Sequence, residues 1–432
     1  MKNKNKFLTF ILIVLSFSFI LQNIAASNTV VRWSRTWSNG FIDNGNDVAV
    51  DSSDNIYLVG KSHNYGGGSG DLVLVKYDNL GAEQWNRTWG GSEYDIGAGI
   101  VLDTSDNIYV AGSTVSFGEG SGDIVLLKYD DSGIKQWNYT WGGSGDETGW
   151  GLTLDSSGNI YVAGTTHSFG VGEGDLALIK FNSSGDVQWN RTWGGGALDT
   201  GNGVAIDSSG DIYVSGVTES FGAINRDLLL AKFNSSGDIQ WNRTWGGVGL
   251  ESGAGIVIDS SDNIYLTGYT KSFGTGFQSD IALIKFNSSG DIQWNRTWGG
   301  ISDEFSGGLT IDSADNIYVS GTTLSFGEGN ADIVLLKYDS IGVKQWNLTW
   351  GWTFYDWGNG VVIDSADNIY LSGYTDSTIN FGSDLYDMVL IKFAEQEEQA
   401  IPGYASLLSV IIVSMISVIY FRKKNLRINN KT

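Results

Sequence analysis

The sequence predicts an all-β protein, a seven-bladed β-propeller with four strands in each blade. Three recurring blocks predict this fold, and each occurs seven times. The motif Trp-x-x-Thr-Trp has its last Trp at 37, 89, 141, 193, 245, 298 and 350. A block ending in Ile-Tyr has its Tyr at 57, 109, 161, 213, 265, 318 and 370, and a third block has its Lys at 76, 128, 180, 232, 285, 337 and 392. The period of about 52 residues is that of one four-stranded blade.

Each repeat contains four short segments that are typical of β-strands. In the fourth repeat they are expected at 203–207, 211–218, 227–233 and 240–245. The segments are rich in Val, Ile, Leu and aromatic residues, and clusters of Gly, Asn, Asp and Ser separate them. A single such sheet would expose apolar faces, so we expect the blades to stack in a closed ring.

The two ends of the repeat array predict how the ring closes. A lone strand at 32–37 precedes the first complete repeat, and the chain leaves the last repeat after Phe393 without a fourth strand. We therefore expect the N-terminal strand to complete the last blade, which removes an exposed sheet edge. The predicted propeller spans residues 31–393.

The N-terminal segment has the pattern of a secretory signal peptide. Residues 1–6 are basic, residues 7–21 are almost wholly apolar, and small residues follow at 25–27. We predict a signal peptide over residues 1–26 and a secreted propeller.

The C-terminal segment predicts a membrane anchor. Residues 402–421 form an apolar run long enough for a transmembrane helix, after an acidic linker at 394–401. A basic tail at 422–432 predicts that the C-terminus is cytoplasmic. The expected location is the extracellular face of the cell membrane, with the membrane contacted through the C-terminal helix.

Charge and composition exclude several classes of function. The chain has 26 basic and 48 acidic residues; eight of the basic residues lie in the two end segments, and all the acidic ones lie between them. A strongly acidic body repels nucleic acid, so we expect no nucleic-acid partner. The absence of Cys excludes disulfides, thiolate metal sites and a cysteine nucleophile.

The stretch Gly-x-Gly-(Val/Ile/Leu)-x-(Val/Leu/Ile)-Asp-Ser-Ser-x-Asn-Ile-Tyr-(Val/Leu)-x-Gly-x-Thr resembles the β-propeller repeat known as SBBP, and it is also similar to the NHL repeat. The resemblance covers all seven repeats and implies a propeller that belongs to a prokaryotic surface or secreted protein. Ile401-Pro402-Gly403-Tyr404, with the apolar run and basic tail, resembles the C-terminal sorting tails of archaeal surface proteins. That second resemblance implies tail processing; a plain transmembrane anchor is the alternative.

Loop variability predicts a binding face. Within each repeat, the turns between the first and second strands and between the third and fourth strands are nearly uniform. The loops between the second and third strands (two–three loops) vary, as do the segments that connect one blade to the next (crossings). Variable loops on a regular scaffold favour recognition, and drift on an unused surface is the alternative. We expect a protein or glycan partner at the cell surface. The candidate contact residues are the aromatic residues of these loops, namely Tyr94, Trp150, Phe305, Trp352, Phe354, Tyr355 and Trp357.

An acidic residue precedes the inner strand in every repeat. Sevenfold geometry should bring these residues to the mouth of the channel, where carboxylate oxygens suit Ca²⁺. Ca²⁺ is therefore the candidate metal, and no other cofactor is expected. The alternative is that each carboxylate accepts backbone N–H groups of its own Gly-rich crossing. The candidate ligands are Asp43, Asp95, Glu147, Asp199, Glu251, Glu304 and Asp356.

The outer strands carry recurring Asn-x-(Ser/Thr) sequons. On a secreted chain these asparagines are candidate glycan acceptors. The six candidates are Asn86, Asn138, Asn190, Asn242, Asn295 and Asn347.

No catalytic motif is evident. The two histidines, His63 and His167, stand in different repeats, and the chain has no His-Glu-x-x-His motif. We predict a non-catalytic, membrane-anchored module for binding, adhesion or scaffolding at the cell surface. One alternative is a secreted carbohydrate-active hydrolase or lyase that uses channel carboxylates. The other is a passive structural component of the envelope.

Overall fold

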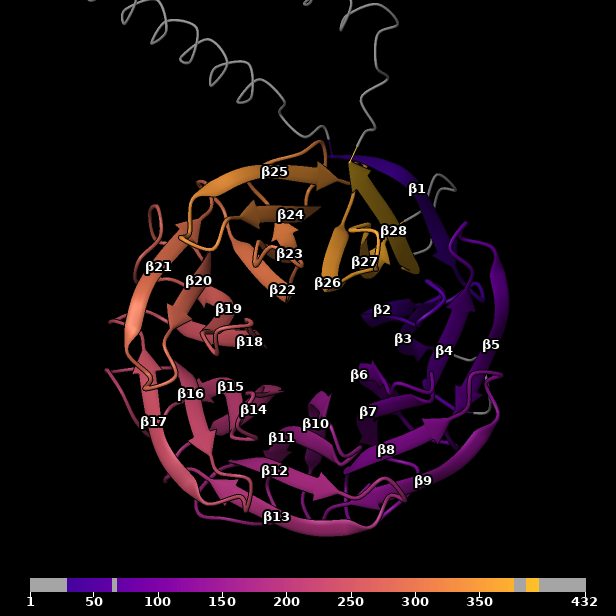
Figure 1. Ribbon diagram of the computed structural model, residues 1–432, viewed down its shortest axis with the longest axis vertical. Helices are drawn as coiled ribbons and strands as arrows, with labels where there is room; N and C mark the ends of the chain where they lie inside the picture. Colours follow the sequence, from indigo (N-terminus) through magenta and orange to yellow (C-terminus); the bar gives the residue numbers. More distant parts are fainter. Residues whose placement is uncertain (1–28, 64–67, 377–385, 396–432) are drawn as a thin grey trace, which may run out of the picture. The chain divides into compact units, whose positions relative to one another are not determined.

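Twenty-eight β-strands make up the regular structure of this protein, in a computed structural model that describes residues 29–63, 68–376 and 386–395. They form seven four-stranded antiparallel sheets arranged around a central opening (Figure 1). The predicted seven-bladed propeller is confirmed, and it occupies the compact unit Val31–Ala394.

A second unit combines Met1–Val30 with Glu395–Thr432 and lies almost wholly outside the described residues. The predicted signal peptide (1–26), anchor (402–421) and basic tail (422–432) all fall there, as does most of the linker (394–401). Within the described ranges, no helix is long and apolar enough to cross a membrane.

Each blade runs outward from the channel in chain order. Blade 1 is β2–β5, blade 2 is β6–β9, and so on to blade 7, which is β26–β28 completed by β1. The inner strands are β2 Asp43–Val50, β6 Asp95–Leu102, β10 Glu147–Leu154, β14 Asp199–Ile206, β18 Glu251–Ile258, β22 Glu304–Ile311 and β26 Asp356–Ile363. The second strands are β3 Ile56–Ser62, β7 Ile108–Thr114, β11 Ile160–Thr166, β15 Ile212–Thr218, β19 Ile264–Thr270, β23 Ile317–Thr323 and β27 Ile369–Thr375.

The outer half of each blade holds the remaining two strands. The third strands are β4 Asp71–Tyr77, β8 Asp123–Tyr129, β12 Asp175–Phe181, β16 Asp227–Phe233, β20 Asp280–Phe286, β24 Asp332–Tyr338 and β28 Asp387–Glu395. The outer strands are β5 Glu83–Trp89, β9 Lys135–Trp141, β13 Val187–Trp193, β17 Ile239–Trp245, β21 Ile292–Trp298, β25 Lys344–Trp350 and β1 Thr29–Trp37.

The inner strands are longer than the sequence predicts. In blade 4 the inner strand starts at Asp199, whereas the expected segment was 203–207. The added residues pair with β15, from Asp199 opposite Thr218 to Gly201 opposite Gly216, and a β-bulge separates them from the rest of the strand. A Gly-rich start followed by a bulge lacks the alternating apolar pattern by which a strand is recognised.

The core lies between the blades. The second and third strands are buried on both faces, which explains their nearly continuous apolar sequences. There are seven clusters of buried side chains, and each joins two neighbouring blades. In one of them Tyr57 and Leu74 of blade 1 pack with Ile108 and Val125 of blade 2. Stacking of blades therefore supplies the core that one blade lacks.

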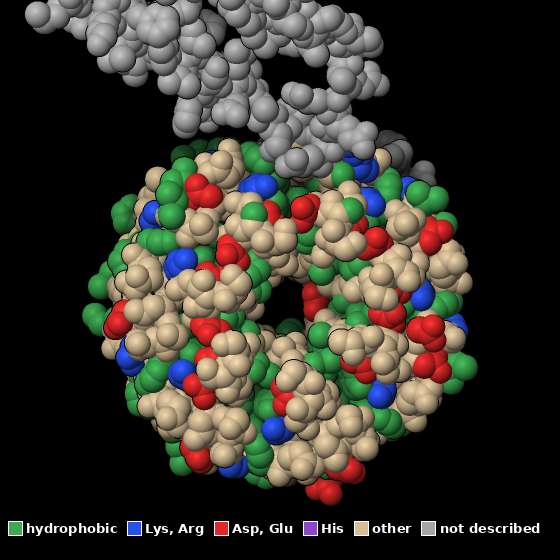
Figure 2. All heavy atoms as spheres, viewed as in Figure 1, with side chains coloured by type: hydrophobic (Ala, Val, Ile, Leu, Met, Phe, Trp, Pro, Cys, Tyr) green, Lys and Arg blue, Asp and Glu red, His purple; other side chains and the backbone are tan. Residues whose placement is uncertain are grey.

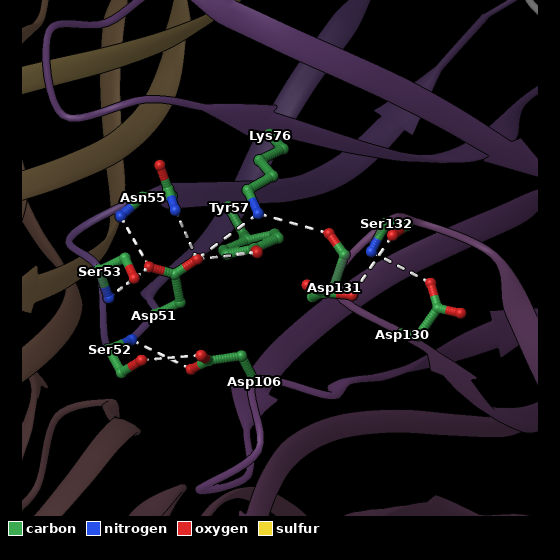
Figure 3. Close-up of polar contacts among 10 residues, drawn as sticks. All are labelled: Asp51, Ser52, Ser53, Asn55, Tyr57, Lys76, Asp106, Asp130, Asp131 and Ser132. Carbon is green, nitrogen blue, oxygen red and sulfur yellow. Dashed lines mark hydrogen bonds and ion pairs between the residues drawn. The ribbon is translucent and has the colours of Figure 1, made fainter.

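Polar contacts on the face that carries the uniform turns fix each turn, and Ser52 and Lys76 of blade 1 also reach Asp106 and Asp131 of blade 2 (Figure 3). Asp51 accepts hydrogen bonds from the backbone N–H groups of Ser53 and Asn55, at 2.9 and 2.8 Å, and from the Tyr57 hydroxyl at 3.0 Å. Lys76 lies 3.5 Å from the same carboxylate. These bonds outweigh the effect of burial and lower the pKa of Asp51. The turn is thus fixed within blade 1 by a charged carboxylate.

Blade 7 closes the ring in the predicted way. The order of its strands is β1-β28-β27-β26, so the N-terminal strand supplies its outer edge. Trp37 of β1 packs in the cluster that contains Val48 of blade 1 and Met388 of blade 7. Asn359 Nδ2 also donates to the Gly45 carbonyl of blade 1 at 2.8 Å. The first and last blades are therefore joined as the other neighbours are.

Candidate functional site

The variable loops gather on one face of the ring, called the loop face below. The crossing into blade 2 contacts two–three loops on both sides: Asp95 N, directly after the crossing, donates to Gly70 O of blade 1 at 2.8 Å, and Glu93 N donates to Ser116 Oγ of blade 2 at 3.0 Å. Within the described ranges the loop face comprises the crossings 38–42, 90–94, 142–146, 194–198, 246–250, 299–303 and 351–355 and the loops 115–122, 167–174, 219–226, 271–279 and 324–331.

Four of the predicted contact residues lie in these crossings. Trp352, Phe354 and Tyr355 are exposed together in the crossing into blade 7, and 67 % of Trp352 is accessible to solvent. Tyr94 is half-buried in the crossing into blade 2, where its ring packs against His63 and lies 4.8 Å from Lys61 Nζ.

The other three predicted contact residues are not in loops, which corrects the sequence interpretation. Trp150, Phe305 and Trp357 belong to the inner strands β10, β22 and β26. Phe305 and Trp357 stack across the interface of blades 6 and 7, with ring centroids 5.3 Å apart. Trp150 instead lines the central channel, and 44 % of it is exposed. The prediction failed because the Gly-rich starts of these strands read as loop.

The seven predicted acidic ligands are the first residues of the inner strands, and all are buried. Glu147 illustrates their contacts: Oε1 accepts the Thr166 hydroxyl at 2.9 Å, and Oε2 accepts Gly143 N–H at 2.7 Å. Burial raises the pKa of Glu304 and Asp356, although hydrogen bonds to each oppose the rise. Each carboxylate thus supports its own Gly-rich crossing. Ca²⁺ binding by these residues stays a prediction; in the described ranges, no three His, Cys, Asp or Glu side chains are grouped as a metal ion requires.

Sequence analysis missed the partners of these acids. The third strand of every blade begins with Asp, and in blades 1 to 6 this carboxylate faces the acid of the next blade across a glycine. A Cβ atom on Gly246 would collide with Asp227 Oδ1 and Glu251 Oε2. Burial raises the pKa of Asp123 to about 6, and the charge of Glu147 adds to the rise. The recurring Asp of the third block was the signal, but its neighbour lies in another blade.

Apolar residues are exposed around the whole loop face, and the five most exposed of them, Ile224, Val248, Phe277, Ile301 and Trp352, lie over blades 4 to 7. These five and their neighbours Leu250, Phe354 and Tyr355 are called the apolar arc. Val248 and Ile301 stand at the tips of two successive crossings, with 75 % and 91 % of their surfaces exposed. Phe277 is 95 % exposed in a loop that contacts the Ile301 crossing, because Thr275 Oγ1 donates to Gly300 O at 2.9 Å. The full arc is Ile224, Val248, Leu250, Phe277, Ile301, Trp352, Phe354 and Tyr355.

Four exposed acidic residues of the loop face lie over blades 2 and 3, in the region that also exposes Phe117 and Val171. Exposed carboxylates stand in the crossings into blades 2 and 3 and in the two–three loops of those blades; they are Glu93, Glu119, Asp146 and Glu173, called the acidic arc. The crossings there carry Ser92 and Ser144 where blades 5 and 6 carry Val248 and Ile301. Blades 2 and 3 lie across the ring from blades 5 and 6 (Figure 1). The acidic arc therefore lies opposite the most exposed apolar residues, and two further carboxylates, Glu219 and Glu328, are exposed over blades 4 and 6.

The candidate glycan acceptors lie on the rim of the ring. All six are in outer strands; Asn138, Asn190, Asn242, Asn295 and Asn347 are exposed. Asn86 is half-buried, and its amide donates to Glu83 at 2.8 Å. Glycan attachment at these residues stays a prediction.

Parts of four repeats match the family model of the SBBP β-propeller repeat, at residues 84–116, 141–170, 192–221 and 250–274. An uncharacterised WD repeat-containing protein of Acanthamoeba polyphaga mimivirus is 23 % identical over 390 residues, which cover 73 % of this chain and 27 % of that protein. The regulatory protein FlaEY of Caulobacter vibrioides is 26 % identical over 171 residues, covering 34 % of this chain and 18 % of that protein. The chain therefore spans a minor part of the length of both relatives.

Solved propellers share the architecture at low sequence identity. The WD40 domain of Neurospora crassa Pan2 aligns with a TM-score of 0.53 and 8 % identity, covering 86 % of this chain and 97 % of that one. BBS1N, solved in complex with ARL6DN, aligns with a TM-score of 0.51 and 10 % identity, covering 86 % and 98 %. At these identities the likeness concerns the fold.

Proposed function

Because this chain is an SBBP β-propeller repeat protein, we propose that it is a non-catalytic binding module that holds a protein partner on its loop face. One observation carries the proposal: the apolar arc exposes large side chains at the tips of three successive crossings. Contiguous exposed apolar residues are costly in water and mark interaction surfaces. The WD-repeat relatives, whose fold type commonly serves as a scaffold, support a binding role.

The acidic arc specifies the chemistry of the partner. A partner that covers both arcs needs apolar residues over blades 4 to 7 and basic residues over blades 2 and 3. Charge complementarity of this kind speeds association and excludes wrong partners. In this proposal the predicted signal peptide directs export, and the predicted C-terminal anchor holds the ring at the outer face of the membrane, where the partner meets it.

The test is selection of binding peptides from a displayed random library on the immobilised full chain. We expect the enriched peptides to combine apolar residues with Lys or Arg. The double variant Ile301→Ala, Trp352→Ala should weaken their binding by about tenfold or more, because large apolar anchors dominate interface energies. Added salt should weaken binding further, since rim charges are screened.

The matched control is Leu80→Ala, which removes an exposed apolar side chain from a turn between third and outer strands on the opposite face. It should leave peptide binding unchanged. Equal loss in both variants would refute the loop face as the binding surface. Enriched peptides that need Trp352 but lack basic residues would refute the role given to the acidic arc.

A further inference from the structure

The central channel breaks the sevenfold symmetry of the ring. It contains a cavity of about 610 Å³ that the inner strands line. Figure 2 shows the central hole, with acidic atoms on the rim beside blades 1 and 2. Among the lining residues, Asp47 is the only acid and Trp150 is the only aromatic residue. Two single substitutions in the repeat thus give one side of the channel its own chemistry.

Both residues stand where the other blades have small or neutral side chains. The fifth residue of the inner strand is Asp47 in blade 1 and Gly in the six other blades. The fourth residue is Trp150 in blade 3 and Asn, Ala or Gly elsewhere. All three asparagines at this position donate a hydrogen bond to the next blade, as Asn46 does to Gly97 O at 2.8 Å. In blade 3 the exposed indole of Trp150 stands in place of such a bond. Packing between the blades does not require this indole.

Asp47 and Trp150 flank the same short segment of blade 2. Asp47 Oδ2 accepts Ile100 N–H at 3.0 Å, and the Trp150 carbonyl oxygen lies against Gly99. The blade 2 residues between them are Ala98, with a small side chain, and Gly99, with none, and both line the cavity. Each carboxylate oxygen of Asp47 accepts one backbone N–H, so both keep capacity for a further donor.

We infer that the channel binds a small organic cation with an aromatic or apolar body, its ammonium group on Asp47 and its body against Trp150. A carboxylate with spare acceptor capacity in a partly desolvated cavity forms strong charge-assisted hydrogen bonds to an ammonium group. An indole ring stacks on an aromatic body and also attracts a cation. Asp47 and Trp150 both belong to inner strands and to none of the loops of the loop face.

The charge of Asp47 gives the site a pH dependence. Burial raises the pKa of Asp47 to about 6, against the effect of the Ile100 and Val48 N–H groups. The acids on the adjoining inner strands, Asp95 and Asp356, are hydrogen-bonded at the starts of β6 and β26. Arg226, the only basic residue that lines the cavity, is paired with Glu219 at 2.8 Å. Affinity for an amine should therefore rise with pH as Asp47 ionises.

The experiment titrates three probes against the full chain by saturation-transfer NMR: phenethylamine, ethylamine and phenylacetate. We expect phenethylamine to bind most tightly, ethylamine weakly and phenylacetate not at all. Asp47→Asn should weaken phenethylamine by about tenfold or more, and Trp150→Ala by about fivefold. Binding should strengthen between about pH 5 and pH 7 in the native chain but not in Asp47→Asn.

Two controls separate binding from folding. Asp47→Glu keeps the charge and should retain amine binding with its pH dependence, and Trp352→Ala on the loop face should leave it unchanged. Thermal unfolding of every variant shows whether the ring is intact. Equal binding of phenylacetate, or amine binding that survives Asp47→Asn in a folded ring, would overturn the inference and leave Asp47 as a support of the blade 1–2 seam.

Discussion

At the scale of single residues, the alternation of Asp and Gly in the turns between inner and second strands has a conformational cause. In five blades the fourth residue of the turn is an Asp in the left-handed region, as Asp54 is at φ 61°. In blades 3 and 4 that position holds Gly158 and Gly210, also at positive φ. Gly adopts this conformation freely, and Asp tolerates it better than most residues. Asp gives an additional benefit, because Asp106 accepts the Ser52 hydroxyl of the preceding blade.

The buried carboxyl pairs between blades are also a residue-scale feature. Burial raises the pKa of Asp123 to about 6 and also raises the pKa of Asp175, Asp227 and Asp332. Asp227 Oδ1 has no hydrogen-bond partner, although it is buried close to Glu251. A proton on that oxygen would supply the missing hydrogen bond. The folded state thus gains from protonation where the unfolded chain does not.

The pairs predict an unusual pH dependence of stability. A carboxyl whose folded pKa exceeds its unfolded value binds more protons in the folded state between roughly pH 4 and pH 6, so the free energy of unfolding should fall as pH rises through this window. Below about pH 4 the free energy of unfolding should decrease as the pH is lowered, because folding lowers the pKa of Asp51 and Asp103. Chemical denaturation at a series of pH values measures this. A free energy of unfolding that rises from pH 4 to pH 7 would contradict it.

Asp227→Asn isolates one pair. The amide donates a hydrogen bond to Glu251 at every pH, so the variant should gain about 1 kcal/mol of stability at neutral pH and lose part of the pH dependence. Glu173→Gln removes the same charge from an exposed loop and serves as the control. If both variants shift stability equally, the effect is one of net charge and the pair contributes nothing specific.

At the scale of elements, the turns between inner and second strands also fasten neighbouring blades. Ser52 N and Oγ donate to Asp106 of blade 2 at 3.0 and 2.7 Å, and Ser208 makes the same two bonds to Asp262 of blade 5. Ser365 of blade 7 donates to Asp54 of blade 1 at 3.2 Å, which repeats the contact at the closure. Blade 4 carries Gly210 at the acceptor position, opposite Ser156 of blade 3. The same turn therefore fastens some interfaces and not others.

This difference predicts the outcome of two matched substitutions. Ser52→Ala removes a side-chain hydrogen bond between blades and should lower the free energy of unfolding by about 0.5–1 kcal/mol. Ser156→Ala changes the same turn opposite Gly210 and should be nearly neutral. Denaturant unfolding of the two variants measures the difference. Equal losses would mean that the hydroxyl acts within its own turn and not between blades.

At the scale of the whole molecule, stability depends on closure of the ring. β17 is joined through the chain to strands on both sides, whereas β1 meets blade 7 only by strand pairing and packing. If β1 detaches, β28 becomes an exposed edge and neighbouring molecules can pair with it. Closure should therefore decide the state of association as well as the stability.

Substitution of two equivalent tryptophans tests this dependence. Trp37→Ala in β1 and Trp245→Ala in β17 remove similarly buried indoles, and each should cost about 3–5 kcal/mol. Only Trp37→Ala should also form concentration-dependent oligomers, because only β1 can leave the ring. Light scattering at several protein concentrations distinguishes the two variants. Oligomers in both, or in neither, would contradict the closure argument.

The sequence alone determined the repeat count, the four strands of each blade and the closure by the N-terminal strand. These features are local or periodic. The seven Trp-x-x-Thr-Trp motifs determine the number of repeats, and the apolar runs of the second and third strands identify the strands within each repeat. The loop face could also be predicted, together with Trp352, Phe354 and Tyr355, since variation between copies is visible in one chain. Asp47 is visible in the sequence as the one departure from a glycine position of the inner strand. The prediction rested on recurring residues, and Asp47 does not recur.

Only the tertiary structure decided which residues meet. Asp227 and Glu251 are 24 positions apart and belong to different blades, and Asp47 and Trp150 are separated by two repeats. Their placement depends on the rotation between successive blades and on the bulges of the inner strands, which the pattern of a single strand does not specify. The same packing buries the acids at the starts of the inner strands, where each supports its own crossing. Backbone pattern is encoded locally, but the neighbours of a side chain follow from how the blades stack.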